Sequence, residues 1–110
     1  MDEEVVPILR VANAATAVAW YERLGFSKEW EHRFDPDCPA FVSIGYGRAR
    51  LFLSEHRGDA RPDTLVGLFV KDIDAVVSEF GRPKEEPPDR CEFELRDPDG
   101  NRLRISKRAT

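Results

Sequence analysis

The feature that most constrains the fold is a plan that occurs twice along the chain. In each half, a strand, a capped helix, a glycine and a hairpin follow one another. Four positions agree at one constant offset: Val11 with Val70, Asn13 with Asp72, Ala17 with Val76, and Tyr21 with Phe80. Self-similarity of this kind indicates a duplicated structural unit. We therefore expect one βαβββ module to be used twice.

The residue patterns place the elements of the first module. Alternating or apolar runs predict strands over residues 5–11, 26–34, 41–44 and 48–54. Asn13 is a suitable N-cap for a helix that runs through Leu24, and Gly25 stands where helices often end. This module is expected to cover about residues 1–54.

The second module, about residues 64–110, follows a polar connector over residues 55–63. A strand is predicted over residues 65–70, followed by a helix that Asp72 caps and Gly81 ends. Residues 82–89 contain three prolines, so any strand there must be short or at a sheet edge. Together the two modules predict a single domain, 1–110.

The last two strands are predicted to form a hairpin around Pro98-Asp99-Gly100, because Pro98 fixes φ and Gly100 can adopt a left-handed conformation. This register places Glu94 opposite Arg104, and Arg96 opposite Arg102. The arginine pair is unfavourable by itself. Either the two side chains splay into solvent, or an anion or carboxylate lies between them.

Composition excludes several classes of protein. The net charge of −4 and the scattered basic residues argue against nucleic-acid binding, which needs a basic surface. No apolar run approaches the ~20 residues of a membrane span, and the acidic start does not resemble a signal peptide. We expect a cytoplasmic protein. Its two cysteines, Cys38 and Cys91, lack the spacing of a zinc site.

Three motifs in order carry a resemblance to a known family: Leu9-Arg10-Val11, Trp20-Tyr21-Glu22-Arg23-Leu24-Gly25-Phe26, and Arg96-Asp97-Pro98-Asp99-Gly100-Asn101-Arg102-Leu103. The chain resembles the vicinal oxygen chelate superfamily, which includes glyoxalases, extradiol dioxygenases and bleomycin-resistance proteins. The resemblance implies an α+β fold in which two βαβββ modules form a curved, cup-like mixed sheet with helices on the outside. It also implies a homodimer whose ligands lie on the concave side.

The same resemblance implies where a metal would be held. The family's enzymes use four cup-facing positions filled by His, Glu or Gln, and in this chain they are Val6, Phe52, Leu65 and Arg104. Apolar side chains and a cation do not supply metal ligands. We therefore expect no metal and no cofactor. Of the two histidines, His32 and His56, the second falls in the connector, so a two-histidine site is not expected either.

Within the family, the chain is most similar to the metal-free bleomycin-resistance proteins, through Val6-Pro7-Ile8-Leu9, Leu24-Gly25-Phe26 and Arg50-Leu51-Phe52-Leu53-Ser54. Those proteins hold a drug in clefts at a dimer interface. Phe41 falls on one of their cleft aromatics, whereas Gly67 stands where they place a stacking tryptophan. The resemblance therefore implies the mode of action and leaves the ligand open.

The candidate ligand-binding residues are aromatic or charged: Trp30, His32, Phe34, Phe41, Phe52, Glu94 and Arg104. Large aromatic faces on a concave sheet suit flat heteroaromatic ligands, and the charged pair could orient a polar group. Two other interpretations stay open. Trp30 and Phe34 could be core or dimer contacts, and Glu94 with Arg104 could simply fill the space of a lost metal.

Three functions follow from these patterns. The first is a binding protein that sequesters a drug-like or glycopeptide small molecule, for example a cationic or heteroaromatic antibiotic, in clefts of a homodimer. The second is an enzyme of the same superfamily, such as a lyase or dioxygenase, and it requires the missing ligand set. The third is a module that binds a protein partner on the same fold.

Overall fold

The computed structural model describes residues 3–81 and 92–107. Its elements follow in the order β1 (Ile8–Arg10), α1 (Ala14–Leu24), β2 (Ser27–His32), β3 (Phe41–Tyr46), β4 (Ala49–Ser54), β5 (Leu65–Val70), α2 (Ile73–Phe80), β6 (Glu92–Arg96) and β7 (Arg102–Lys107). The α+β class is confirmed. The proline-rich segment 82–89, where an edge strand was considered, lies outside the described residues.

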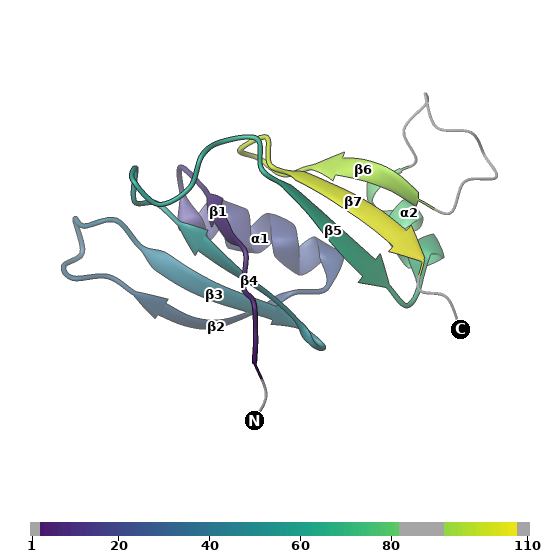
Figure 1. The fold of residues 1–110 in the computed structure, drawn as a ribbon, viewed down its shortest axis with the longest axis horizontal. Helices are drawn as coiled ribbons and strands as arrows, with labels where there is room; N and C mark the ends of the chain where they lie inside the picture. The colour runs from purple at the N-terminus through teal and green to yellow at the C-terminus, as the bar shows by residue number, and fades with distance from the viewer. Residues whose placement is uncertain (1–2, 82–91, 108–110) are drawn as a thin grey trace.

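The strands form two sheets, one of four strands in the order β1-β4-β3-β2 and one of three in the order β5-β7-β6. In each sheet the first strand runs parallel to a later one: β1 pairs with β4, and β5 pairs with β7. The other pairs are antiparallel hairpins. Figure 1 shows the sheets side by side with both helices behind them. The strands therefore turn one face toward the helices and an open face away from them.

A single cluster of buried apolar residues fills the space between the sheets and the helices. Alternation along β4 and β7 directs Leu51, Leu53, Leu103 and Ile105 into this core. From α1 it receives Ala14, Ala17, Tyr21 and Leu24, which recur at helical spacing. In the described residues, no helix is long and apolar enough to cross a membrane.

Both helices begin at the predicted caps. The side chain of Asn13 accepts a hydrogen bond from the Thr16 amide at 2.9 Å, and that of Asp72 accepts one from the Ala75 amide at 3.1 Å. Gly25 ends α1 with φ of 121°, and a Cβ there would lie 3.1 Å from the Tyr46 ring. Glycine is therefore needed at this position both for the turn and for the close approach of the ring.

The β6–β7 hairpin is closed as predicted, and its loop is organised by the buried carboxylate of Asp97. Gly100 has φ of 84°, and the Asp97 amide donates to the Asn101 carbonyl at 2.9 Å. Asp97 Oδ1 accepts from the amides of Asp99 and Asn101 at 2.8 and 2.9 Å. Its Oδ2 accepts from the Tyr21 hydroxyl at 2.7 Å and from Asn101 Nδ2 at 3.0 Å. Four donors therefore satisfy this buried charge.

The same loop binds the end of β1 and the start of β5. Asn101 Nδ2 donates to the Arg10 carbonyl at 2.9 Å, and Asn101 Oδ1 accepts from the Thr64 amide at 3.3 Å. The Ala12 amide donates to Asp99 Oδ1 at 2.8 Å. Through these bonds the loop fixes the first sheet and α1 relative to the second sheet.

The substitution Tyr21→Phe tests the contribution of this network. It removes one hydrogen bond to a buried charge, so we expect the free energy of unfolding to fall by about 1.5–3 kcal/mol. Urea denaturation followed by circular dichroism measures the change. Tyr46→Phe is the matched control, because the Tyr46 hydroxyl has no hydrogen-bond partner among residues 3–81 and 92–107. Equal losses in the two variants would contradict the assignment.

The same tyrosine should make the fold sensitive to alkaline pH. Burial raises the pKa of Tyr21, and the neighbouring Asp97 charge raises it further. In the unfolded chain a tyrosine loses its proton near pH 10, so above about pH 10 the folded state binds more protons than the unfolded state and stability falls. Urea denaturation from about pH 8 to about pH 11 should show a smaller loss in Tyr21→Phe than in wild type. Parallel losses would contradict this linkage.

Candidate functional site

Three aromatic rings lie together on the open face of the first sheet, one each from β2, β3 and β4. Trp30 is stacked on Phe41, with ring centroids 6.1 Å apart and planes 16° apart. Phe52 completes the group at 5.5 Å from Trp30 and 5.1 Å from Phe41. We call Trp30, Phe41 and Phe52 the aromatic shelf. The strand register explains it, because Ser43 of β3 pairs with both Trp30 and Phe52 on the same face.

The shelf is open to solvent. Trp30 is 46% exposed, and Phe41 and Phe52 are partly exposed. Beneath these rings, Ser43 is fully buried. An uncovered group of aromatic side chains in a soluble protein marks an interaction surface more often than an isolated exposed ring does. The shelf offers a broad apolar surface to a flat ligand.

A charged cluster that the sequence analysis did not predict lies beside the shelf. Glu29 sits at a β-bulge, where the pairing of β2 with β3 shifts between Lys28 and Trp30. Its Oε1 accepts from Ser43 Oγ and from Arg50 Nε, both at 2.7 Å, and its Oε2 accepts from Arg50 Nη2 at 2.8 Å. Hydrogen bonds from Arg50 and then Ser43 lower the pKa of Glu29 to about 2.

Arg50 also binds Glu4, so two carboxylates share one guanidinium and the cluster has a net charge of −1. Space for it depends on Gly45, where a Cβ would lie only 2.7 Å from Glu29 Oε2. In the sequence, Glu29 falls on the polar side of the alternation with Glu31 and Arg33, and the break in the alternation is the charged Lys28. A bulge cannot be located from that signal alone.

His32 lies at the edge of the shelf face, where it is paired with Phe41, and Phe34 follows beyond the end of β2. Their rings are 5.6 Å apart at 72°, and Phe34 is 84% exposed. Residue 32 is the last of β2, so the alternation that keeps Trp30 on the shelf does not extend to Phe34. Of the four aromatics expected to cluster, the structure brings Trp30, Phe41 and Phe52 together and leaves Phe34 apart.

The open face of the second sheet carries the other predicted pair. Glu94 is opposite Arg104, and Arg96 is opposite Arg102, as the register predicted. However, the Glu94 carboxylate contacts the two other arginines, at 3.7 Å from Arg96 and 3.9 Å from Arg102. The Asp63 carboxylate contacts the same two arginines, at 3.7 Å from Arg96 and 2.9 Å from Arg102. Carboxylates therefore lie between the like charges, which is one of the two outcomes expected.

Two details complete this cluster. The Nε of Arg102 is buried and lies 2.9 Å from Asp63 Oδ1, yet it has no acceptor in hydrogen-bonding geometry among the described residues, so the contact is purely ionic. Arg104 is exposed and has no ion-pair partner in the part of the chain that the structure describes. Arg104 and Glu94 are therefore opposite each other on neighbouring strands, as expected, but their charged groups do not form an ion pair.

The positions at which the family holds a metal do not fit one. Phe52 of β4 and Arg104 of β7 are equivalent, since each is paired with the first strand of its sheet, at Ile8 and Gly67. A phenyl ring offers no lone pair, and a guanidinium repels a cation. Among the described residues, no group of three or more His, Cys, Asp or Glu side chains could hold a metal ion.

Comparison with solved structures shows what this fold is similar to. Glyoxalase I from Leishmania major matches with a TM-score of 0.75 and 18% identity, over 97% of this chain and 87% of that chain. A bleomycin-binding protein complexed with bleomycin matches with a TM-score of 0.70 and 20% identity, over 98% and 100%. An antibiotic-binding protein from Streptomyces sp. CB03234 matches with a TM-score of 0.68 and 16% identity, over 99% of each chain.

Sequence comparison agrees on the family. No match was found among curated proteins. The family model described as "Glyoxalase superfamily protein" matches residues 1–110, which is the whole sequence. Together with the folds above, this match shows that the chain belongs to the glyoxalase superfamily.

Proposed function

We propose that the protein is a metal-free binding protein of the bleomycin-resistance type, which holds a flat, drug-like small molecule against the aromatic shelf. The observation that carries the proposal is the exposed group of Trp30, Phe41 and Phe52. Aromatic side chains bind planar ligands by burying apolar area and by offset stacking. The ligand is sequestered and not changed.

The charged cluster beside the shelf supports a cationic group on the ligand. Glu4 and Glu29 share Arg50, and the low pKa of Glu29 keeps its carboxylate ionised at neutral pH. The remaining charge of −1 attracts a cation at the edge of the shelf. Trp30 adds to this preference, because an indole face also attracts cations. A heteroaromatic antibiotic or a glycopeptide with a cationic part has this chemistry.

The solved structures of similar fold support the same class of ligand. They include a bleomycin-binding protein with its drug and an antibiotic-binding protein, although they also include glyoxalase I. The enzyme alternative needs a metal, and Phe52 and Arg104 are unsuitable ligands at two of the four positions. The shelf therefore favours binding over catalysis.

We also propose that two copies associate through the open face. Large apolar side chains exposed there come from both sheets: Ile8 at 39%, Trp30 at 46%, Leu65 at 40% and Phe69 at 63%. Exposed apolar area of this extent favours burial against another surface. A second copy would cover part of the face and enclose the shelf in a cleft.

Ligand binding is tested by tryptophan fluorescence in a Trp20→Phe background, which leaves Trp30 as the only tryptophan. Titration with a bleomycin-type glycopeptide should quench Trp30 in a saturable way, and Phe41→Ala should weaken binding about tenfold because it removes one aromatic contact of roughly 0.5–1.5 kcal/mol together with its buried area.

Phe34→Ala is the control for this titration, because Phe34 is exposed and outside the shelf, and it should leave the affinity unchanged. The titration is repeated with and without a divalent metal. Quenching that requires the metal would favour the enzyme alternative over the binding protein. No quenching in either condition would exclude bleomycin-type glycopeptides as ligands.

Association is tested by analytical ultracentrifugation. Wild type should sediment as a dimer of a 12.6 kDa chain, whereas Phe69→Glu should shift the equilibrium toward the monomer by placing a charge in the interface. Ala19→Glu places the same charge on the exposed helical side and should leave the dimer intact. A monomeric wild type at high concentration would contradict the proposal.

A further inference from the structure

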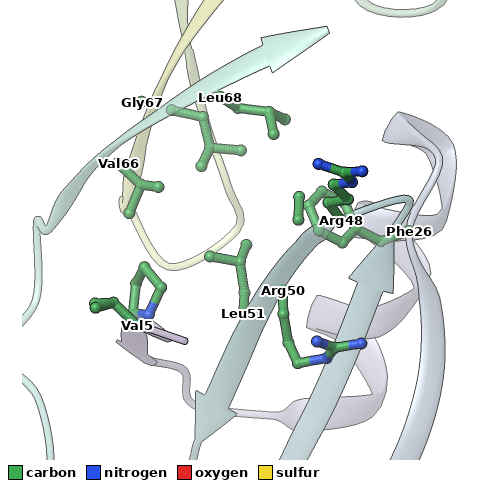
Figure 2. Close-up of a pocket in the computed structure, with 11 residues that line it drawn as sticks. Val5, Phe26, Arg48, Arg50, Leu51, Val66, Gly67 and Leu68 are labelled. Atoms are coloured by element: carbon green, nitrogen blue, oxygen red, sulfur yellow. The ribbon is translucent and has the colours of Figure 1, made fainter. Parts of the chain in front are cut away.

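A cavity lies between the two sheets, lined in part by Arg50 of the charged cluster. It has a volume of about 200 Å³ and opens between the start of β4 and β5, as Figure 2 shows. It shares Arg48, Ala49, Gly67 and Leu68 with a wider groove of about 600 Å³ beside the β3–β4 turn. The cavity therefore leads out to the surface along this turn.

The strand lengths explain the gap. β1 contains only Ile8–Arg10, and the Phe52 amide donates to the Pro7 carbonyl at 2.9 Å as the chain enters this strand. Ala49 at the start of β4 is paired with Tyr46 of β3, and β5 is paired with β7. In the described structure, β4 and β5 therefore belong to different sheets and no backbone hydrogen bonds of a sheet join them where the cavity lies.

The inner wall of the cavity is apolar and well packed. Phe26, Leu51, Leu68 and Leu103 line it and are 3%, 5%, 8% and 0% exposed. Leu51 points into the space from below in Figure 2. These side chains face the helices, whereas the shelf is on the opposite face of the sheet. An apolar cavity of roughly 150 Å³ is already large enough to bind benzene.

The outer end of the cavity is cationic. Arg48 and Arg50 line the cavity, and Arg48 and Lys71 line the wider groove. Arg50 belongs with Glu4 and Glu29 to the cluster of net charge −1, but Arg48 and Lys71 are exposed and have no ion-pair partner among residues 3–81 and 92–107. No aspartate or glutamate of the described segments lines either space.

We propose that this cavity binds an aliphatic carboxylate, with its alkyl chain among the buried leucines and its carboxylate toward Arg48 and Lys71. Apolar walls favour the chain, since its burial removes hydrocarbon from water. Two unpaired cations at one end favour an anionic head group over a neutral one. The site shares Arg50 with the charged cluster beside the shelf but takes a ligand of opposite charge.

The experiment uses octanoate as the probe and follows leucine and valine methyl groups of the full chain by ¹H–¹³C correlation spectra. Octanoate should shift the methyl resonances of Leu51, Leu68 and Leu103 in a saturable way and leave the Trp30 indole signal unchanged. 1-Octanol should bind more weakly, because it has the same chain without the charge.

Two variants separate the parts of the site. Arg48→Glu should weaken octanoate binding about fivefold, the scale of an exposed ion pair, whereas Arg57→Glu in the exposed connector should have no effect. Ala49→Phe fills the space shared by the cavity and the groove and should abolish binding, with its melting temperature checking that the variant folds.

Four results would overturn the proposal. One is the absence of saturable shifts at the three leucines. Another is equal binding of octanoate and 1-octanol, or an affinity unaffected by Arg48→Glu, because either would exclude the anionic class. The last is a shift confined to the Trp30 indole, which would place octanoate on the shelf.

Discussion

The arrangement of the two modules depends on one buried carboxylate. Asp97 accepts hydrogen bonds from its own hairpin loop and from Tyr21 of α1, while Asn101 beside it reaches Arg10 and Thr64. A buried charge is tolerated only when its lone pairs are satisfied; here three of the four donors belong to Asp99 and Asn101 of the same loop, and the fourth, the Tyr21 hydroxyl, comes from α1. The carboxylate has all four donors only when α1 lies against the loop, so closure of the hairpin and docking of α1 are coupled.

The sequence predicted the α+β class and most element boundaries because local rules decide them. Asn13 and Asp72 begin helices through their side-chain oxygens, Gly25 ends one through its backbone conformation, and Pro98 with Gly100 sets the hairpin register. The contacts of Asp97 and Asn101 could not be predicted in the same way. Their partners are chosen by tertiary packing, and a polar residue next to a turn is usually explained by the turn alone.

The candidate site was predicted in part for the same reason. Period-two alternation and register place Trp30, Phe41 and Phe52 on one face, so the shelf could be found from strands alone. The alternation does not place Phe34 correctly, because β2 ends at His32. Glu29 was not predicted as a site residue because a bulge shifts the register by one residue. A carboxylate between the arginines was anticipated, but one of the two found there, Asp63, lies in the connector, whose path no periodic pattern fixes.

The outer strand of the first sheet has a further consequence. All six residues of β2 are exposed, and the strand carries Lys28, Glu29 and Glu31 around its bulge. Charges and a local kink discourage another chain from extending the sheet by strand addition. The protein can thus keep aromatic rings uncovered close to an open edge without polymerising into fibrils. The faces of the sheets, and not this edge, are then the surfaces left for contacts with other molecules.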